Sequence, residues 1–167
     1  MTLSFSHLGI CVSDLDRSLR FYCEGLGFEE VASHHVGGEF AALMEVEGVE
    51  LESRMLSRDG VTIELLGYAA PGTTGEATRR PMNQLGLTHL SLRVDDVDGL
   101  AATIEALGGT VVPTTRTTFE LPGARLDFLY CTDPDGVRIE LMDLPDVSAP
   151  DDGDATGHRA GSGTVMP

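Results

Sequence analysis

Four residues of this chain have side chains that could share one metal ion. His7 and His89 each stand in a short stretch with the alternating pattern of a β-strand, S-H-L-G-I-C-V and T-H-L-S-L-R-V. Glu64 and Glu140 stand in two further stretches of this kind, V-T-I-E-L-L and V-R-I-E-L-M. Two imidazoles and two carboxylates suit a divalent transition metal such as Fe, Co, Ni, Mn or Zn. Four ligands also leave coordination positions open for water or a bidentate substrate.

The alternation of each strand sets the direction of these side chains. Glu64 stands between Ile63 and Leu65, and Glu140 stands between two apolar residues in the same way. Successive side chains of a strand point to opposite faces, so the acid faces away from its apolar neighbours. A single strand histidine is commonly a core residue, and a single strand glutamate commonly faces solvent. Four such residues at matching places predict instead a shared cup, where a cation would remove the repulsion and desolvation cost of two buried carboxylates.

The matching places arise from an internal repeat. When the two histidines are aligned, the helix starts that follow them align as well, and when the two glutamates are aligned, so do the turns before them. These further matches pair Asp14 with Asp96, Asp16 with Asp98 and Gly60 with Gly136. Neither half could close its own sheet. The predicted fold class is therefore α+β, with two tandem βαβββ modules forming a curved, cup-like mixed sheet with helices outside.

The boundaries of the elements follow the repeat. Residues 1–70 form the first predicted module, 71–85 a linker without periodicity, 86–145 the second module and 146–167 a flexible acidic tail. Helix starts are predicted at Ser13 and Asp95, because each has an acid three residues later, which is the spacing of a capping box. The predicted strands are 3–12, 28–35, 50–57, 61–68, 87–94, 110–115, 125–131 and 137–143, and a short helix could lie around 40–43.

Charge and cysteine content exclude several classes of function. The chain has 167 residues and a formal net charge of −16, whereas binding to nucleic acid or to an anionic membrane needs a basic face. No apolar run is long enough to span a bilayer and no signal pattern is present, so we expect a cytoplasmic protein. Three cysteines without a C-x-x-C pair argue against a disulfide framework or a zinc ribbon. We expect a small-molecule substrate and a homodimer, and the sequence leaves open whether one chain or two complete the cup.

The motifs around the four residues resemble those of the vicinal oxygen chelate superfamily. The matching pieces are H-L-G-I-C-V-S-D-L, R-F-Y-C-E-G-L-G-F, G-L-T-H-L-S-L-R-V-D-D-V and D-P-D-G-V-R-I-E-L, and the resemblance covers residues 3–144. Its members include glyoxalase I, methylmalonyl-CoA epimerase, extradiol dioxygenases and fosfomycin-resistance proteins. The resemblance implies that His7, Glu64, His89 and Glu140 bind one divalent metal, since this set is similar to that of bacterial glyoxalase I. Extradiol dioxygenases lack an acid at the Glu64 position, and methylmalonyl-CoA epimerases typically have glutamine there.

This ligand set favours proton transfer. A metal polarises a carbonyl, and a carboxylate takes the α-proton and returns it, so Glu64 and Glu140 would be both ligands and the acid/base pair. We predict an epimerase or isomerase acting α to a carbonyl, on a keto-sugar or cyclitol, a hydroxyketone or an acyl thioester. An apparent insertion at 37–48 and a composition without lysine, typical of GC-rich genomes in which glutathione is often absent, weigh against glutathione-dependent glyoxalase I. The alternatives are lactoylglutathione lyase (glyoxalase I), an Fe(II)-dependent ring-cleaving dioxygenase and a metal-free ligand-sequestering resistance protein.

Three further residues are candidates for contact with the substrate. Arg138 has the parity of Glu140 and could bind an anionic group, with a salt bridge to a structural acid as the alternative. Arg54 lies in the middle of a predicted strand and has the same two interpretations. His35 follows another histidine, and because adjacent strand residues face opposite ways, one of the two at most enters the cup.

Overall fold

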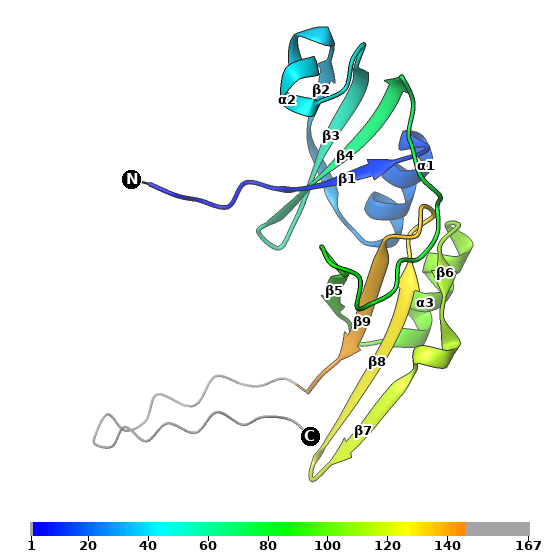
Figure 1. Cartoon of the computed structure of the whole chain (residues 1–167). Helices are drawn as coiled ribbons and strands as arrows, with labels where there is room; N and C mark the ends of the chain where they lie inside the picture. Colours follow the sequence, from blue (N-terminus) through cyan, green and yellow to red (C-terminus); the bar gives the residue numbers. More distant parts are fainter. Residues whose placement is uncertain (1, 146–167) are drawn as a thin grey trace.

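The computed structural model describes residues 2–145, so the predicted tail at 146–167 lies outside the described residues. The chain folds into two sheets, one from each half of the described sequence (Figure 1). The first sheet has the order β1-β4-β3-β2, from β1 (Leu8–Val12), β2 (Glu29–Val36), β3 (Glu50–Arg58) and β4 (Val61–Ala70). The second has the order β5-β9-β8-β6, with β7 also paired to β8, from β5 (Leu90–Arg93), β6 (Thr110–Val111), β7 (Thr117–Leu121), β8 (Ala124–Thr132) and β9 (Arg138–Asp143).

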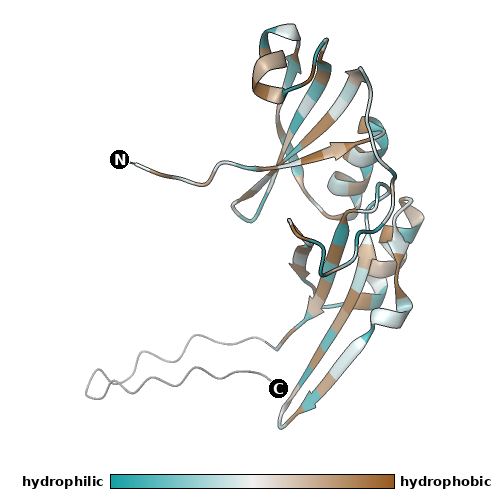
Figure 2. Ribbon diagram, in the orientation of Figure 1, coloured by the Kyte–Doolittle hydropathy of each residue, from teal (hydrophilic) through white to brown (hydrophobic). Residues whose placement is uncertain are grey.

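The two sheets repeat one topology. In each, the first strand is parallel to the last, β1 to β4 and β5 to β9, and the remaining pairs are antiparallel. Hydrophobic and hydrophilic residues alternate along β3 and β4 (Figure 2), as strands with one buried face require. The predicted α+β class is confirmed. The arrangement of the strands differs from the expectation: the described strands form two separate sheets and not one continuous, cup-like sheet.

One helical segment of each half covers the apolar face of its sheet. The helices are α1 (Leu15–Arg20), which continues into η1 (Phe21–Gly25), and α3 (Val97–Ala106), and shorter turns are η2 (Gly38–Phe40), α2 (Ala41–Met44) and η3 (Pro113–Thr115). The caps lie one residue later than predicted: Asp14 accepts a hydrogen bond from the Arg17 amide at 2.9 Å, and Asp96 accepts one from the Gly99 amide at 2.9 Å. Ser13 does not cap the helix because its hydroxyl donates to Asp135 of the other half. No described helix is long and apolar enough to cross a membrane.

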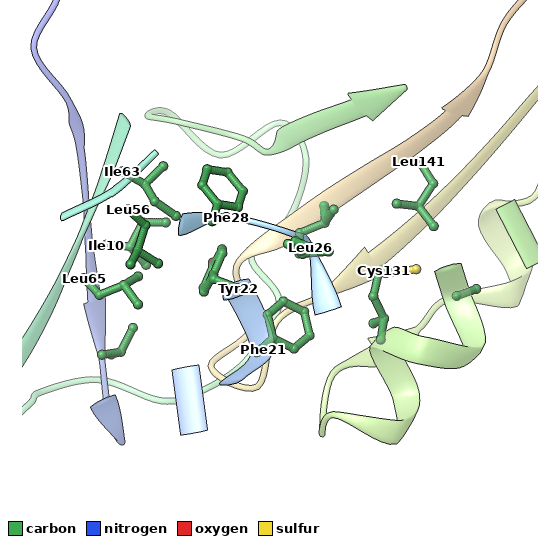
Figure 3. Close-up of a cluster of buried hydrophobic side chains, with 14 of the residues drawn as sticks. Ile10, Phe21, Tyr22, Leu26, Phe28, Leu56, Ile63, Leu65, Cys131 and Leu141 are labelled. Atoms are coloured by element: carbon green, nitrogen blue, oxygen red, sulfur yellow. The ribbon is translucent and has the colours of Figure 1, made fainter. Parts of the chain in front are cut away.

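Both halves share one hydrophobic core. Figure 3 shows Phe21 and Tyr22 of η1 between Ile63 and Leu65 of the first sheet and Leu141 of the second. All five side chains belong to one buried cluster, in which Phe21 and Tyr22 are fully buried. Because the apolar faces of the two sheets meet this common core, the opposite, polar face of each sheet is left on the outside. The positions of His7, Glu64, His89 and Glu140 follow from this arrangement.

Polar contacts of the β8–β9 turn fix the two halves against each other. The buried carboxylate of Asp133 accepts a hydrogen bond from the Tyr22 hydroxyl at 3.0 Å. Asp135 accepts hydrogen bonds from the Ser13 amide at 2.9 Å and from the Arg17 guanidinium at 2.8 Å. The turn of the second half therefore holds the start of the helix of the first half, next to the shared core.

A candidate metal centre in two halves

The first histidine and the first glutamate form a pair on the polar face of the first sheet. His7 directly precedes β1, and Gly9 of that strand lies opposite Glu64 of β4. This parallel pairing brings the Nε2 atom of His7 to 3.2 Å from the Oε2 atom of Glu64. The side chains are partly exposed, at 37 % for the histidine and 20 % for the glutamate, so the pair is open to a ligand from outside the chain. We call His7 and Glu64 the first half-site.

The second half of the chain repeats this geometry. His89 directly precedes β5, and Ser91 of β5 lies opposite Glu140 of β9. The Nε2 atom of His89 lies 3.3 Å from the Oε2 atom of Glu140. His89 and Glu140, which we call the second half-site, are somewhat less exposed than the first pair.

The spacing within each pair fits two neighbouring ligands of one metal ion. Nitrogen and oxygen ligands lie about 2.1 Å from a divalent transition metal, so two of them at a right angle are about 3.0 Å apart and at a tetrahedral angle about 3.4 Å apart. The distances of 3.2 and 3.3 Å lie between these values. In both pairs the atom that faces the carboxylate is Nε2, the free ring nitrogen that a metal would take. The donor set and its spacing therefore fit a divalent metal in each half-site.

A hydroxyl group holds the other nitrogen of each ring. The Nδ1 atom of His7 lies 2.9 Å from the hydroxyl of Ser6, and that of His89 lies 2.9 Å from the hydroxyl of Thr88. Hydrogen bonds of this kind orient metal-binding histidines and set which nitrogen is free. The sequence prediction did not use these residues, although the signal was present: a hydroxyl residue directly precedes both repeated histidines.

Serines also hold the two carboxylates, but not in the same way. The hydroxyl of the buried Ser53 donates to Oε1 of Glu64 at 2.5 Å, which leaves Oε2 facing His7. The hydroxyl of Ser91 donates at 2.8 Å to Oε2 of Glu140, the same oxygen that faces His89. The two half-sites are thus repeats in their ligands and differ in how the carboxylate is oriented.

The two half-sites do not meet within one chain. Across residues 2–145, no group of three or more histidine, cysteine, aspartate or glutamate side chains lies close enough together to hold a metal ion. The expected convergence of four ligands is therefore not formed by this chain alone. The physical reason is the shared core, because it holds the apolar sides of both sheets together and turns their polar faces to the outside.

Tyr130 lies beside the second half-site and is a residue that sequence reasoning missed. It lies opposite Glu140 in the β8–β9 register, and its ring packs edge-on against the ring of His89 with 5.6 Å between the centroids. Burial, and then the hydrogen bond and charge of Glu140, raise the pKa of the Tyr130 hydroxyl. Its position opposite Glu140 follows from the β8–β9 register, which the sequence alone does not specify.

Of the three predicted substrate residues, the structure places one beside a half-site. Arg138 lies two residues before Glu140 on β9, and its guanidinium lies 5.1 Å from the ring centre of Tyr130. No ion pair of Arg138 with an acid is formed among the described residues, so the alternative of a structural salt bridge is not seen.

The other two predicted substrate residues lie away from the half-sites. Arg54 is opposite Leu65 in the β3–β4 register, so it lies on the face away from Glu64, and it pairs with Glu30 at 3.0 Å. His35 contacts two glutamates of β3, at 3.0 and 3.1 Å, and its side chain is 65 % exposed. The hydrogen bond to one of them, Glu52, raises the pKa of His35. The structure brings neither residue to a half-site.

Comparison with known proteins gives one family. Residues 4–141 match the family model described as the glyoxalase/bleomycin resistance protein/dioxygenase superfamily. The chain is 29 % identical over 147 residues to a 2-epi-5-epi-valiolone epimerase of an Actinomyces species, covering 83 % of this chain and 78 % of that protein. It is 31 % identical over 136 residues to a probable lactoylglutathione lyase of Vibrio cholerae, covering 81 % and 87 %.

Solved structures share the fold. A glyoxalase family protein from Bacillus cereus superimposes with a TM-score of 0.72 at 20 % identity, covering 86 % of this chain and 95 % of that one. The fosfomycin resistance protein FosX from Listeria monocytogenes, solved in complex with Mn(II) and sulfate, gives a TM-score of 0.51 at 19 % identity, covering 86 % and 93 %. At these identities the structures show the fold alone.

Proposed function

Because the chain belongs to the glyoxalase/bleomycin resistance protein/dioxygenase superfamily, we propose that it is a divalent-metal-dependent epimerase or isomerase that moves a proton α to a carbonyl. The observation that carries the proposal is the presence of one histidine–glutamate pair in each half of the chain, at nearly equal spacing. Each pair supplies a carboxylate, and two carboxylates on opposite sides of a substrate allow a proton to be taken from one face and returned to the other.

The metal would be held by His7 and Glu64 together with His89 and Glu140. Since the half-sites lie on separate sheets, we propose that a second copy of the chain supplies the complementary pair, which makes the protein a homodimer. Both histidines stand at the start of an edge strand, β1 or β5, whose outer backbone has no partner among the described strands. Edge strands are the parts of a sheet most available to another chain.

The residues of the chain divide the chemistry as follows. A bound divalent ion would make the α-proton of a carbonyl substrate more acidic. The carboxylates of Glu64 and Glu140, which lie beside the histidines, would take and return this proton when they are not coordinated. Ser53 and Ser91 orient the two carboxylates. Because the carboxylates come from different half-sites, one can remove the proton from one side of the substrate and the other can return it on the opposite side.

The proposed substrate is a hydroxyketone, a keto-sugar or cyclitol, or an acyl thioester. The similarity to a protein named an epimerase supports this choice over other members of the superfamily. A second candidate is lactoylglutathione lyase, because the chain is also 31 % identical to a protein of that name. The contact between Glu64 and His7 speaks against a ring-cleaving dioxygenase in which Glu64 is a bystander, and both pairs together speak against a metal-free sequestering protein. The cytoplasmic location and the absence of a nucleic-acid partner stay predictions from composition.

Metal analysis and proton exchange test the proposal. The purified chain is expected to contain one divalent metal per chain, and His7→Ala and Glu140→Gln to lose it. In heavy water the metal-loaded protein should exchange the α-proton of a substrate from a panel of ketones, cyclitols and thioesters without consuming glutathione or oxygen. Turnover only of the methylglyoxal–glutathione adduct would identify the lyase instead. Metal-free protein with unchanged folding, or oxygen uptake with ring cleavage, would refute the proposal.

A further inference from the structure

A cavity of about 360 Å³ lies where the linker that precedes β5 passes over the second half of the chain. Figure 1 shows this linker running beside the turn between β8 and β9. Two arginines, Arg80 of the linker and Arg138 of β9, supply charge to its wall. A cavity of this size with apolar walls and few polar groups is typical of a small-molecule site. The apolar walls include Leu8, Ile10, Leu87 and Val137.

The linker is fixed in place over this cavity by specific contacts. The guanidinium of Arg138 donates to the backbone carbonyl of Arg80 at 2.7 Å, and the guanidinium of Arg80 donates to the carbonyl of Leu85 at 2.7 Å. The backbone of Thr78 packs directly on Gly136, where a Cβ atom would lie 2.6 Å from the Thr78 carbonyl carbon. The wall is therefore built from ordered backbone and side-chain contacts.

Arg138 is a buried cation without an acidic partner. The residue is 7 % exposed, and neither it nor Arg79 nor Arg80 forms an ion pair within the described part of the chain. Its guanidinium lies over the ring of Tyr130. A buried, unpaired charge costs free energy that an anion in the cavity would offset.

We propose that this cavity binds a small organic monocarboxylate, with the carboxylate group on Arg138 and Arg80 and the apolar part of the molecule on the hydrophobic walls. Guanidinium groups are well suited to carboxylates. A single negative charge fits better than the double charge of a phosphate, because Glu76 and Asp135 also line the cavity.

The two acids differ in their availability. Asp135 is already engaged by Ser13 and Arg17. Glu76 has no ion pair within residues 2–145, so its charge opposes an incoming anion. The proposal therefore predicts opposite effects at two residues: neutralising Arg138 weakens binding, and neutralising Glu76 strengthens it.

The cavity also joins the second half-site, because Thr88 and His89 line it. That the bound acid is the substrate rests on the proposed function, and it narrows the substrate to a carbonyl compound that carries a carboxylate. Binding of the acid does not depend on the reaction, so the two can fail separately.

Titration calorimetry of the full-length chain as purified tests the proposal, with and without EDTA. The ligands are 4-phenylbutanoate, the neutral 4-phenylbutanamide and 4-phenylbutyl phosphate. We expect the carboxylate to bind at least about tenfold more tightly than the amide, as one charge-assisted hydrogen-bonded contact provides. Arg138→Gln should lose about tenfold in affinity, and Glu76→Gln should gain about threefold, as loss of one partly screened repulsion predicts. Arg125→Gln, which removes an arginine on the distant β7–β8 hairpin, is the matched control and should bind like the wild type.

Several results would overturn the inference. These are equal affinity for acid and amide, tighter binding of the phosphate, loss of affinity with EDTA, or a folded Arg138→Gln that binds normally. If Arg138→Gln does not fold, an unchanged or weaker affinity of Glu76→Gln overturns it. Carboxylate binding by a protein that never exchanges an α-proton would refute the proposed function and leave this inference intact. Exchange without carboxylate binding would refute this inference alone.

Discussion

Mixing two inactive variants would show whether the metal centre is shared between chains. One variant carries His7→Ala and Glu64→Gln, which removes the first half-site, and the other carries His89→Ala and Glu140→Gln, which removes the second. In a homodimer with shared sites, each variant alone has two broken sites. A mixed dimer has one site in which both mutated halves meet and one site in which both intact halves meet.

The expected magnitude follows from this geometry. Random reassembly of equal amounts gives mixed dimers for about half of the population, and each has one intact site of two, so the mixture should recover about one quarter of the wild-type signal. The variants are refolded together from urea, and both bound metal per chain and α-proton exchange are measured. Metal content gives a readout that does not depend on knowing the substrate.

Two controls make the mixing experiment decisive. Each variant refolded alone should stay near zero, and a chain with His34→Ala and Glu47→Gln, the same residue types away from the half-sites, should keep the wild-type signal. A mixture that stays at zero while mixed dimers are present would refute a site shared between chains. Metal retained by either variant alone would refute the assignment of its half-site.

Three further predictions concern residues that support the site and the fold. Ser53→Ala removes the hydrogen bond to Oε1 of Glu64 and should weaken metal binding by about 10- to 100-fold in a metal titration. Ser57→Ala, near the end of the same strand, is the control and should leave the metal affinity unchanged. Equal metal affinities of the two variants would contradict a positioning role for Ser53. Arg116 lowers the pKa of the buried Asp127 in the folded protein through a hydrogen bond. The stability that Asp127 contributes is therefore fully present above its pKa in the unfolded chain, about 4, and is lost as the pH falls through its lower pKa in the folded protein. Arg116→Gln should therefore reduce the free energy of unfolding in urea by about 1–3 kcal/mol at pH 7 and by less at pH 3, and an equal loss at both pH values would exclude this linkage. Gly136→Ala places a Cβ atom 2.6 Å from Thr78 at a φ of +87°, while Gly60→Ala at a φ of +78° meets nothing within 4 Å. Backbone strain should lower the free energy of unfolding of both variants by about 1 kcal/mol. Gly136→Ala should be destabilised further and become sensitive to proteolysis within the linker, whereas Gly60→Ala should not. Equal behaviour of the two variants would show that the linker is not held at Gly136.

The alternation and the repeat predicted the sheet face on which Glu64 and Glu140 lie, because both depend on local rules. The parity of a strand fixes which side chains share a face, and Glu64 lies on the face away from Ile63 and Leu65 as expected. Parity does not carry over from one strand to the next, however. Arg54 has an even number like Glu64, but the β3–β4 register places it opposite Leu65 and hence on the other face. Register depends on hairpin geometry and packing, which residue spacing alone does not specify.

The placement of the two modules was also beyond what the sequence could predict. The repeat indicates that two apolar sheet faces must be covered, and this requirement is met equally by one closed cup or by two sheets around a common core. The decision depends on residues such as Phe21 and Tyr22, which are fully buried between the halves, and on the hydrogen bond from Tyr22 to Asp133. Nothing in the spacing of these two aromatic residues indicates that they contact the other module.

The shared core has a consequence for how the metal centre can form. Bringing the half-sites together within one chain would require the two polar faces to turn toward each other, which would expose Phe21, Tyr22, Leu65 and Leu141 to water. Burial of each phenylalanine or leucine side chain contributes about 1.5–3 kcal/mol, so the rearrangement would cost a large part of the stability of a domain of this size. A second chain can complete each half-site without opening the core. The same contacts that make the single chain stable therefore leave the proposed metal centre incomplete within one chain, and the mixing experiment measures this division directly.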